Sequence, residues 1–242
     1  MNDVPLSGEV SLRDIAGNVA AVRARIDAAA GGRRVLLLAA TKMNDAQRIR
    51  AAVAAGVDGC GENRVQELLQ KLPQGAYDGA RVHFIGHLQS NKVRQIVGKV
   101  DMIESVGSQE LLRLISERAE KSGLRQDVLL EVNIGGEEQK SGFAPGSLPS
   151  ALSLCGALGG VRVRGLMTVP PISPFPGGNR PHFDRMSELF VDIAGKKYDN
   201  VCMDFLSMGM SADFEDAIRA GANLVRVGSA IFGARDYSPA HA

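Results

Sequence analysis

Charge of one sign and paired cysteines are both scarce in this 242-residue sequence. Lys and Arg number 28 against 27 Asp and Glu, so the formal net charge is only +1. Such a balance excludes the strong field with which a protein holds a nucleic acid or an anionic membrane. The three cysteines, Cys60, Cys155 and Cys202, lie far apart without a CxxC spacing. They argue against a disulfide framework or a structural zinc site and fit a reducing cytoplasm.

Long apolar runs are missing as well. The first thirty residues carry charged side chains and no apolar core of a signal peptide, so neither a secretory signal nor a membrane anchor is expected. No later segment offers an apolar run long enough to span a bilayer. We therefore expect a cytoplasmic protein with one domain over 1–242, with disordered tails at 1–8 and 238–242.

Short apolar runs alternate with helical patterns along the chain. An amphipathic helix is predicted at 10–29 and ends at Gly31-Gly32. The predicted strands are 35–40, 57–60, 82–85, 102–105, 128–132, 163–167, 203–206 and 224–227. The helices predicted between them are 46–55, 64–72, 91–97, 109–122, 148–158, 183–194 and 213–220.

This alternation predicts an α/β fold, a single (β/α)₈ TIM-type barrel with an additional N-terminal helix. The alternative is a doubly wound open sheet, which favours a GxGxxG turn after an early strand. Here the first strand ends in "AATKMND" instead. A proline-rich loop at 168–182 follows the sixth strand and either covers an active site or is a tolerated surface insertion.

Lys42 follows the first predicted strand at its carboxyl end, where barrel active sites form. A lysine crowded by apolar walls or another cation loses its proton more easily, and the amine can then condense with an aldehyde. The alternative is a solvated lysine in a strand-to-helix loop.

Small residues follow the seventh and eighth strands in "FLSMGMSADFEDA" and "LVRVGSAIFG". These two loops form the usual phosphate site of a barrel, which predicts an anion-binding role for Ser207, Gly209, Ser211, Gly228 and Ser229. Ordinary turn chemistry is the alternative, with Ser211 capping the next helix. Arg226 lies two residues before Gly228 and should face the same way. A buried arginine needs an acceptor, which is either the ligand or a carboxylate in the barrel core.

Seven segments, in chain order, closely resemble the pyridoxal phosphate homeostasis protein family: "LLAATK", "GENRVQE", "HFIGHLQSNK", "EVNIGGEEQKSGF", "RGLMTVP", "LSMGMSADFEDAI" and "VRVGSAIFGAR". The resemblance runs from about residue 35 to 237. That family looks like the isolated N-terminal barrel of alanine racemase. The cofactor implied is pyridoxal 5′-phosphate (PLP), the active form of vitamin B6.

The resemblance implies that Lys42 holds PLP as a Schiff base, that Ser207, Gly228 and Ser229 hold its phosphate, and that Arg226 faces the pyridine nitrogen. Because a guanidinium keeps its protons, that nitrogen would stay unprotonated and the ring would be a weak electron sink. Asn63 and Met167 should line the ring pocket, unless Asn63 caps a helix and Met167 fills the core.

Two histidines, His83 and His87, stand four residues apart in and after a strand, with no acidic partner apparent in the sequence. A metal site is therefore not expected. Alanine racemase uses a second base, a tyrosine from a C-terminal domain, and here only Tyr77, Tyr198 and Tyr237 are present. With no second domain expected, we predict no catalytic residue of that kind.

The favoured hypothesis is a monomeric, non-enzymatic PLP-binding protein that buffers PLP or delivers it to PLP-dependent apoenzymes. One alternative is a PLP enzyme with weak or narrow racemase-like activity. Another is a barrel that handles phosphosugars without PLP.

Overall fold

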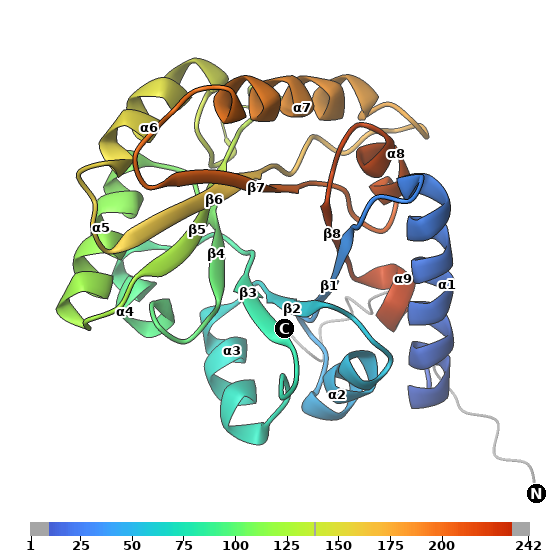
Figure 1. Cartoon of the computed structure of the whole chain (residues 1–242). Coiled ribbons are helices and arrows are strands. Elements are labelled where there is room, and N and C mark those ends of the chain that lie inside the picture. Colours follow the sequence, from blue (N-terminus) through green and yellow to red (C-terminus); the bar gives the residue numbers. More distant parts are fainter. Residues whose placement is uncertain (1–9, 138, 234–242) are drawn as a thin grey trace, which may run out of the picture.

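Eight parallel strands close into a barrel in the computed structural model, which describes residues 10–137 and 139–233 (Figure 1). Each strand pairs with the next along the chain, and β1 pairs with β8. The predicted tails 1–8 and 238–242 lie outside the described residues. The strands are β1 Leu36–Ala40, β2 Gly59–Glu62, β3 Arg81–Phe84, β4 Met102–Val106, β5 Gln126–Glu131, β6 Val161–Met167, β7 Val201–Ser207 and β8 Leu224–Val227.

Helices surround the barrel and connect its strands (Figure 1). The α-helices are α1 Leu12–Ala30, α2 Ala46–Ala54, α3 Val65–Lys71, α4 Val93–Ile96, α5 Gln109–Lys121, α6 Leu148–Cys155, α7 Arg180–Ala194, α8 Phe214–Arg219 and α9 Ser229–Phe232. Short 3₁₀ helices occupy Leu72–Gln74, Ser90–Lys92 and Pro145–Ser147. Among the described residues, no helix combines the length and the hydropathy needed to cross a bilayer.

The predicted barrel and its extra N-terminal helix are confirmed, with differences at the boundaries. The second strand begins at Gly59, two residues later than predicted, and the fifth begins at Gln126, two residues earlier. The proline-rich loop ends at Asn179, because Pro181 lies in the first turn of α7, where a missing amide costs no helical hydrogen bond. The short helix α9 was not predicted.

Helix α1 begins with a capping box. The Ser11 hydroxyl accepts a hydrogen bond from the Asp14 amide, and the Asp14 carboxylate accepts one from the Ser11 amide. Its apolar face buries Ile15, Val19 and Val22. The helix packs against α2, α8 and α9 and so covers the side of the barrel where β8 meets β1 (Figure 1).

The pairing between β7 and β8 is the shortest in the barrel. Only Ser207 and Leu224 pair across it, whereas β1 and β8 share four pairs. The Asn223 side chain links the two edges: its amide nitrogen donates to the Asp204 carbonyl at 2.7 Å, and its oxygen accepts from the Leu206 amide at 2.8 Å. A side chain thus replaces part of a backbone ladder at this seam.

Candidate functional site

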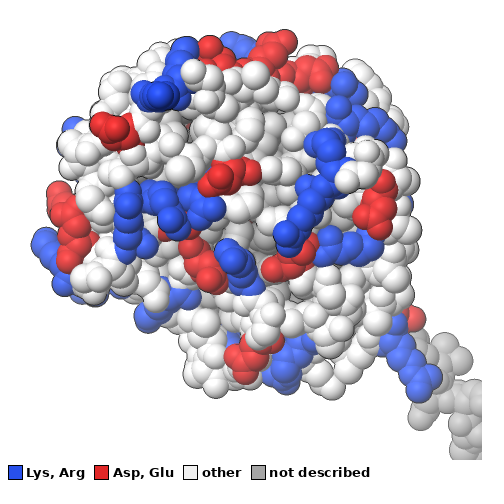
Figure 2. All heavy atoms as spheres, viewed as in Figure 1, with Lys and Arg blue, Asp and Glu red and all other residues white. Residues whose placement is uncertain are grey.

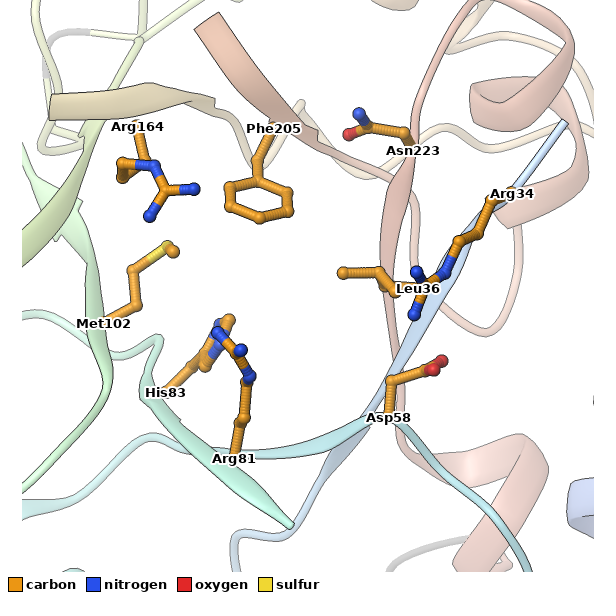
Figure 3. A pocket seen from close by; sticks show the side chains of 9 residues that line it. All are labelled: Arg34, Leu36, Asp58, Arg81, His83, Met102, Arg164, Phe205 and Asn223. Atoms are coloured by element: carbon orange, nitrogen blue, oxygen red, sulfur yellow. The ribbon is translucent and has the colours of Figure 1, made fainter. Parts of the chain in front are cut away.

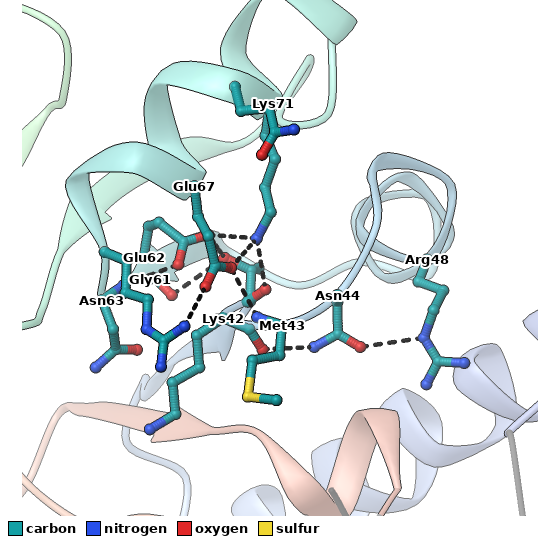
Figure 4. Close-up of polar contacts among 12 residues, drawn as sticks. Lys42, Met43, Asn44, Arg48, Gly61, Glu62, Asn63, Glu67 and Lys71 are labelled. Carbon is teal, nitrogen blue, oxygen red and sulfur yellow. Dashed lines mark hydrogen bonds and ion pairs between the residues drawn. The ribbon is translucent and has the colours of Figure 1, made fainter. Parts of the chain in front are cut away.

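Lys42 lies two residues after β1, and the loops after β7 and β8 leave the barrel at the same end because all strands are parallel. Its side chain is half-buried. In Figure 4 it points away from Lys71 and from the carboxylates of Glu62 and Glu67. The predicted position of the lysine at the carboxyl end of the barrel is therefore confirmed.

A buried ionic network supports the backbone on the N-terminal side of Lys42. The Lys71 ammonium donates to the Thr41 carbonyl at 3.1 Å, to Glu62 at 2.9 Å and to Glu67 at 2.7 Å. The Thr41 and Tyr77 hydroxyls each donate to the same Glu62 oxygen at 3.0 Å. Lys71 is 7% exposed and Glu62 fully buried, so these contacts form away from bulk water.

The residue on the other side, Met43, has a left-handed backbone with φ 62°. This conformation is unfavourable for a side chain other than glycine. The Met43 amide donates to Glu67 at 2.7 Å. Burial acts to raise the pKa of Glu67, but the hydrogen bond from Lys71 and the Met43 amide outweigh it and hold that pKa below its usual value. An ionised Glu67 therefore helps to fix the turn that carries Lys42.

Ser211 brings the loops after β7 and β8 together. Its hydroxyl oxygen accepts hydrogen bonds from the amides of Gly228 at 3.1 Å and Ala230 at 3.3 Å. The alternative role of Ser211 as a helix cap is wrong, because Asp213 is the residue before α8. Two amides that converge on one oxygen atom are also suited to a phosphate oxygen.

Gly209 leaves no room for a side chain in the same loop. Its φ is +93°, and a Cβ atom there would lie 2.6 Å from Ala217 Cβ and 2.9 Å from Phe214 Cα. Its carbonyl accepts a hydrogen bond from the Arg226 amide at 3.1 Å. Glycine therefore lets the loop after β7 pack directly against β8 and α8.

Ser207 does not join this amide cluster. Its hydroxyl lies inside the barrel, where it donates to Glu104 at 2.6 Å and accepts from Arg226. A second nitrogen of Arg226 donates to the Thr168 carbonyl at 2.8 Å. Ser207 thus orients Arg226, which differs from the phosphate-binding role expected for its hydroxyl.

Glu104 links these groups to His83, whose Nδ1 lies 2.6 Å from a Glu104 oxygen. An acidic partner for His83 therefore exists, contrary to the impression from the sequence. Burial acts to raise the pKa of Glu104, but the hydrogen bond and charge of His83, the charge of Arg226 and the Ser207 hydroxyl hold that pKa below its usual value. Burial lowers the pKa of Arg226, against the opposing charges of Glu104 and Glu131.

The two residues expected to line a ring pocket lie in different surroundings. The Asn63 Oδ1 atom, after β2, is buried without a hydrogen-bond partner in the described part of the chain, and Asn63 does not cap α3. Such an atom is costly unless a ligand or water satisfies it. Met167 is 1% exposed and packs with Met102 and Leu129 in a small cluster inside the barrel.

The residues at this end therefore fit PLP in four respects: an amine on Lys42, an amide cluster at Gly228, a buried guanidinium on Arg226 and an orphaned acceptor on Asn63. Across residues 10–137 and 139–233, no group of three or more His, Cys, Asp or Glu side chains is placed to hold a metal ion.

The supporting residues Glu62, Glu67, Lys71 and Glu104 were not singled out from the sequence. A carboxylate within an apolar strand, as in "MIESV", was the available signal. The Ala230 amide was also missed, because α9 was not predicted and backbone groups leave no residue-type signal.

Known proteins resemble this chain in sequence and fold. Residues 10–236 match the alanine racemase N-terminal domain. The pyridoxal phosphate homeostasis protein of Aquifex aeolicus is 44% identical over 201 residues, which cover 83% of this chain and 87% of the relative. The structure of PipY from Synechococcus elongatus PCC7942 with PLP bound is 31% identical, with a TM-score of 0.80, covering 90% of this chain and all of PipY.

A likeness in fold extends to an alanine racemase with a longer chain. Alanine racemase from Streptomyces lavendulae superposes with a TM-score of 0.73 at 19% identity, over 94% of this chain but 58% of the racemase. At this identity the comparison shows a shared barrel only.

Proposed function

Because the chain belongs to the alanine racemase N-terminal domain family and, within it, to the pyridoxal phosphate homeostasis proteins, we propose that it binds PLP on Lys42 and serves to hold and deliver the cofactor. PLP offers an aldehyde that condenses with an amine, a phosphate, and a pyridine nitrogen. The observation that carries the proposal is the convergence of Lys42, the Ser211–Gly228–Ala230 cluster and Arg226 at one end of the barrel.

Each part of the cofactor has a matching group. Lys42 supplies the amine on a turn held by Glu67 and Lys71. The amides of Gly228 and Ala230, with the Ser211 hydroxyl and the exposed Ser229, would hold the phosphate. Ser207 would act by orienting Arg226.

Arg226 supports storage over catalysis. A guanidinium has N–H groups beyond the two that reach Ser207 and Thr168, and it offers a pyridine nitrogen a hydrogen bond without a transferable proton. An unprotonated ring withdraws electrons weakly, unlike a ring paired with a carboxylate.

The described tyrosines also fit a protein without a second catalytic base. The Tyr77 hydroxyl is buried and donates to Glu62, and burial, foremost, together with that carboxylate, strongly raises the pKa of Tyr77. Tyr198 precedes β7 and so lies toward the opposite end of the barrel from Lys42. Tyr237 lies outside the described residues.

Absorbance spectroscopy tests the anchor. Wild-type protein mixed with PLP and desalted should keep a visible band of the lysine-bound cofactor. Lys42→Ala should lose the band, and Lys99→Ala, which removes an exposed lysine next to β4, should keep it. A visible band that persists in Lys42→Ala would refute the assignment of Lys42.

Delivery is supported by apolar side chains exposed at the same end of the barrel. Ile172 is 96% exposed and Phe175 63% exposed in the loop after β6, and Met43 and Met210 are exposed after β1 and β7. Several apolar side chains exposed at one end of a protein are typical of a contact surface. The recipients proposed are PLP-dependent apoenzymes, and the free cysteines support a reducing compartment such as the cytoplasm.

A transfer assay tests delivery. Loaded wild-type protein should activate an apo-aminotransferase faster than PLP is lost to buffer. Ile172→Ser/Phe175→Ser should slow that transfer, whereas Val191→Ser, 66% exposed on α7, should leave it unchanged. Equal transfer by all three proteins, or transfer no faster than release, would contradict delivery by contact.

Weak racemisation is the second candidate function, favoured only by the barrel shared with alanine racemase. Loaded protein incubated with L-amino acids in deuterated water should show no steady exchange at the α-carbon. Exchange with inversion would establish the racemase-like activity instead.

A further inference from the structure

A cavity opens at the opposite end of the barrel from Lys42. It has a volume of about 450 Å³, and its lining includes Leu36, Arg81 and Met102, at or near the amino ends of β1, β3 and β4. We name it the lower pocket. Binding sites for small molecules typically have volumes of about 300–1,000 Å³. In the view of Figure 2, Lys and Arg side chains mix with Asp and Glu side chains around the middle of this face.

The charged lining of the lower pocket is mainly basic. It contains Arg34, Arg81 and Arg164 against one acid, Asp58. Arg164 is paired with Asp127 and Asp204, and Asp58 is paired with Arg23. Arg34 and Arg81 are exposed, and their side chains form no ion pair or hydrogen bond with another described residue. Two guanidinium groups therefore remain to bind an anion.

The lining of the pocket is suited to a small organic molecule. Figure 3 shows the guanidinium groups of Arg81 and Arg164, the Phe205 ring and the Met102 side chain around one open space. Arg164 also lies over the Phe205 ring, 5.3 Å from its centroid. The combination of an aromatic face, a thioether and arginines fits a small molecule with anionic groups better than a bare ion.

The floor of the pocket connects to the cofactor end through the barrel interior. His83 lines the pocket, is 3% exposed, and has Nδ1 bonded to Glu104 at 2.6 Å. Its other ring nitrogen, Nε2, meets no hydrogen-bond partner among the described residues. Glu104 in turn accepts from Ser207 at 2.6 Å and lies 3.8 Å from Arg226.

We propose that the lower pocket binds a small organic anion carrying carboxylate or phosphate groups on Arg34 and Arg81, and that its contact with His83 is sensed at Arg226 through Glu104. The second half rests on the proposed function, in which Arg226 faces the cofactor. A ligand on Nε2 and the carboxylate on Nδ1 hold the same imidazole ring. A ligand that turns the ring therefore changes the hydrogen bond between His83 and Glu104. A shift of the Glu104 carboxylate then changes its distance from Arg226.

The seam between β7 and β8 gives such a ligand a second route of influence. Phe205 and Asn223, which line the pocket, flank the edge where only Ser207 and Leu224 pair. These strands lead directly into the loops of Ser211 and Gly228. A ligand at the seam would contact Phe205 in β7 and Asn223 directly before β8, and these two strands lead to the Ser211–Gly228–Ala230 cluster.

Calorimetric titration of PLP-free protein with the dicarboxylate malonate tests the site itself. Wild-type protein should bind malonate saturably, with a shift of the His83 imidazole signal in NMR spectra. Arg34→Gln/Arg81→Gln should bind about a hundredfold more weakly, since each of the two charge-assisted contacts contributes an affinity factor of about ten. Arg94→Gln, an exposed arginine on α4, should bind as wild type.

Absence of saturable binding, or equal affinity in Arg34→Gln/Arg81→Gln, would overturn the proposal. Binding that survives in this variant but disappears when PLP is loaded would place the anion at the Ser211 cluster and would overturn it equally. Malonate should shift the absorbance of bound PLP in wild-type protein and not in Glu104→Gln; an unchanged wild-type spectrum would overturn the link to Arg226. A protein that takes up no PLP refutes the proposed function, while the PLP-free titration still decides the site.

Discussion

At the scale of single residues, Glu104 links more polar groups inside the barrel than any residue that we singled out from the sequence. It is fully buried, pairs with His83, and accepts from Ser207 beside Arg226. A buried carboxylate is tolerated only where such partners satisfy both oxygens. Its protonation should therefore be visible in the stability of the whole protein.

Glu104→Gln should lower the free energy of unfolding by about 2 kcal/mol near neutral pH, since a hydrogen-bonded charge is removed from the core. The folded-state pKa of Glu104 lies below the ordinary 4.5, so its contribution is complete above that value and is lost as the pH falls through the folded-state pKa. Urea denaturation at several pH values should show the two proteins converging in acid. A difference that stays constant from neutral pH down to the acid limit of folding would contradict this.

Lys71→Met should destabilise the protein by about 3 kcal/mol, because Glu62 and Glu67 would lose their buried cation. The second change in Lys71→Met/Glu62→Gln should recover part of that loss, which a double-mutant cycle measures. Lys121→Met, exposed at the end of α5, is the matched control and should change stability by less than about 0.5 kcal/mol. Additive effects of the two single changes would mean that the pair does not interact.

The sequence predicted that Lys42 and the last two loops lie at the carboxyl end of the barrel, because each follows a predicted strand. It did not reveal Lys71, which reads as an ordinary residue at the end of an amphipathic helix. Nor did the sequence predict that Ser207 and Ser211 have different roles. Ser207 is the last residue of β7, so its side chain lies inside the barrel, whereas Ser211 lies in the loop that follows.

At the scale of secondary-structure elements, the seam between β7 and β8 is held by Asn223. Asn223→Ala should remove two hydrogen bonds and lower stability by about 1–2 kcal/mol. Hydrogen exchange should become faster at the Leu206 amide and remain unchanged at amides of β2 and β3. Asn91→Ala, at an exposed position near α4, serves as control. Uniform acceleration across all strands would show that the seam has no local role.

The predicted strands were confirmed because buried parallel strands form apolar runs bounded by polar turns. Their ends were less predictable. β2 has the sequence Gly59-Cys60-Gly61-Glu62. The apolar pattern does not predict that this strand ends at a glutamate, whose carboxylate lies in the ionic network with Lys71. Helix α9 has four residues, too few to show a helical period.

At the scale of the whole molecule, PLP would join β1 to the loops after β7 and β8, across the closure of the barrel. Saturating PLP should therefore raise the melting temperature of wild-type protein, since a ligand at 100 times its Kd adds about 2.7 kcal/mol. Scanning calorimetry should show a much smaller shift for Lys42→Ala. A shift of equal size in that variant would mean that the stabilising site does not involve Lys42.

Reduction with borohydride followed by peptide mapping tests the central claim most directly, because it converts a lysine-bound PLP into a stable mark on one residue. Protein loaded with stoichiometric PLP, reduced and digested should carry the pyridoxyl phosphate mass on the peptide that contains Lys42. A label confined to another lysine, or no label at all, would contradict the account.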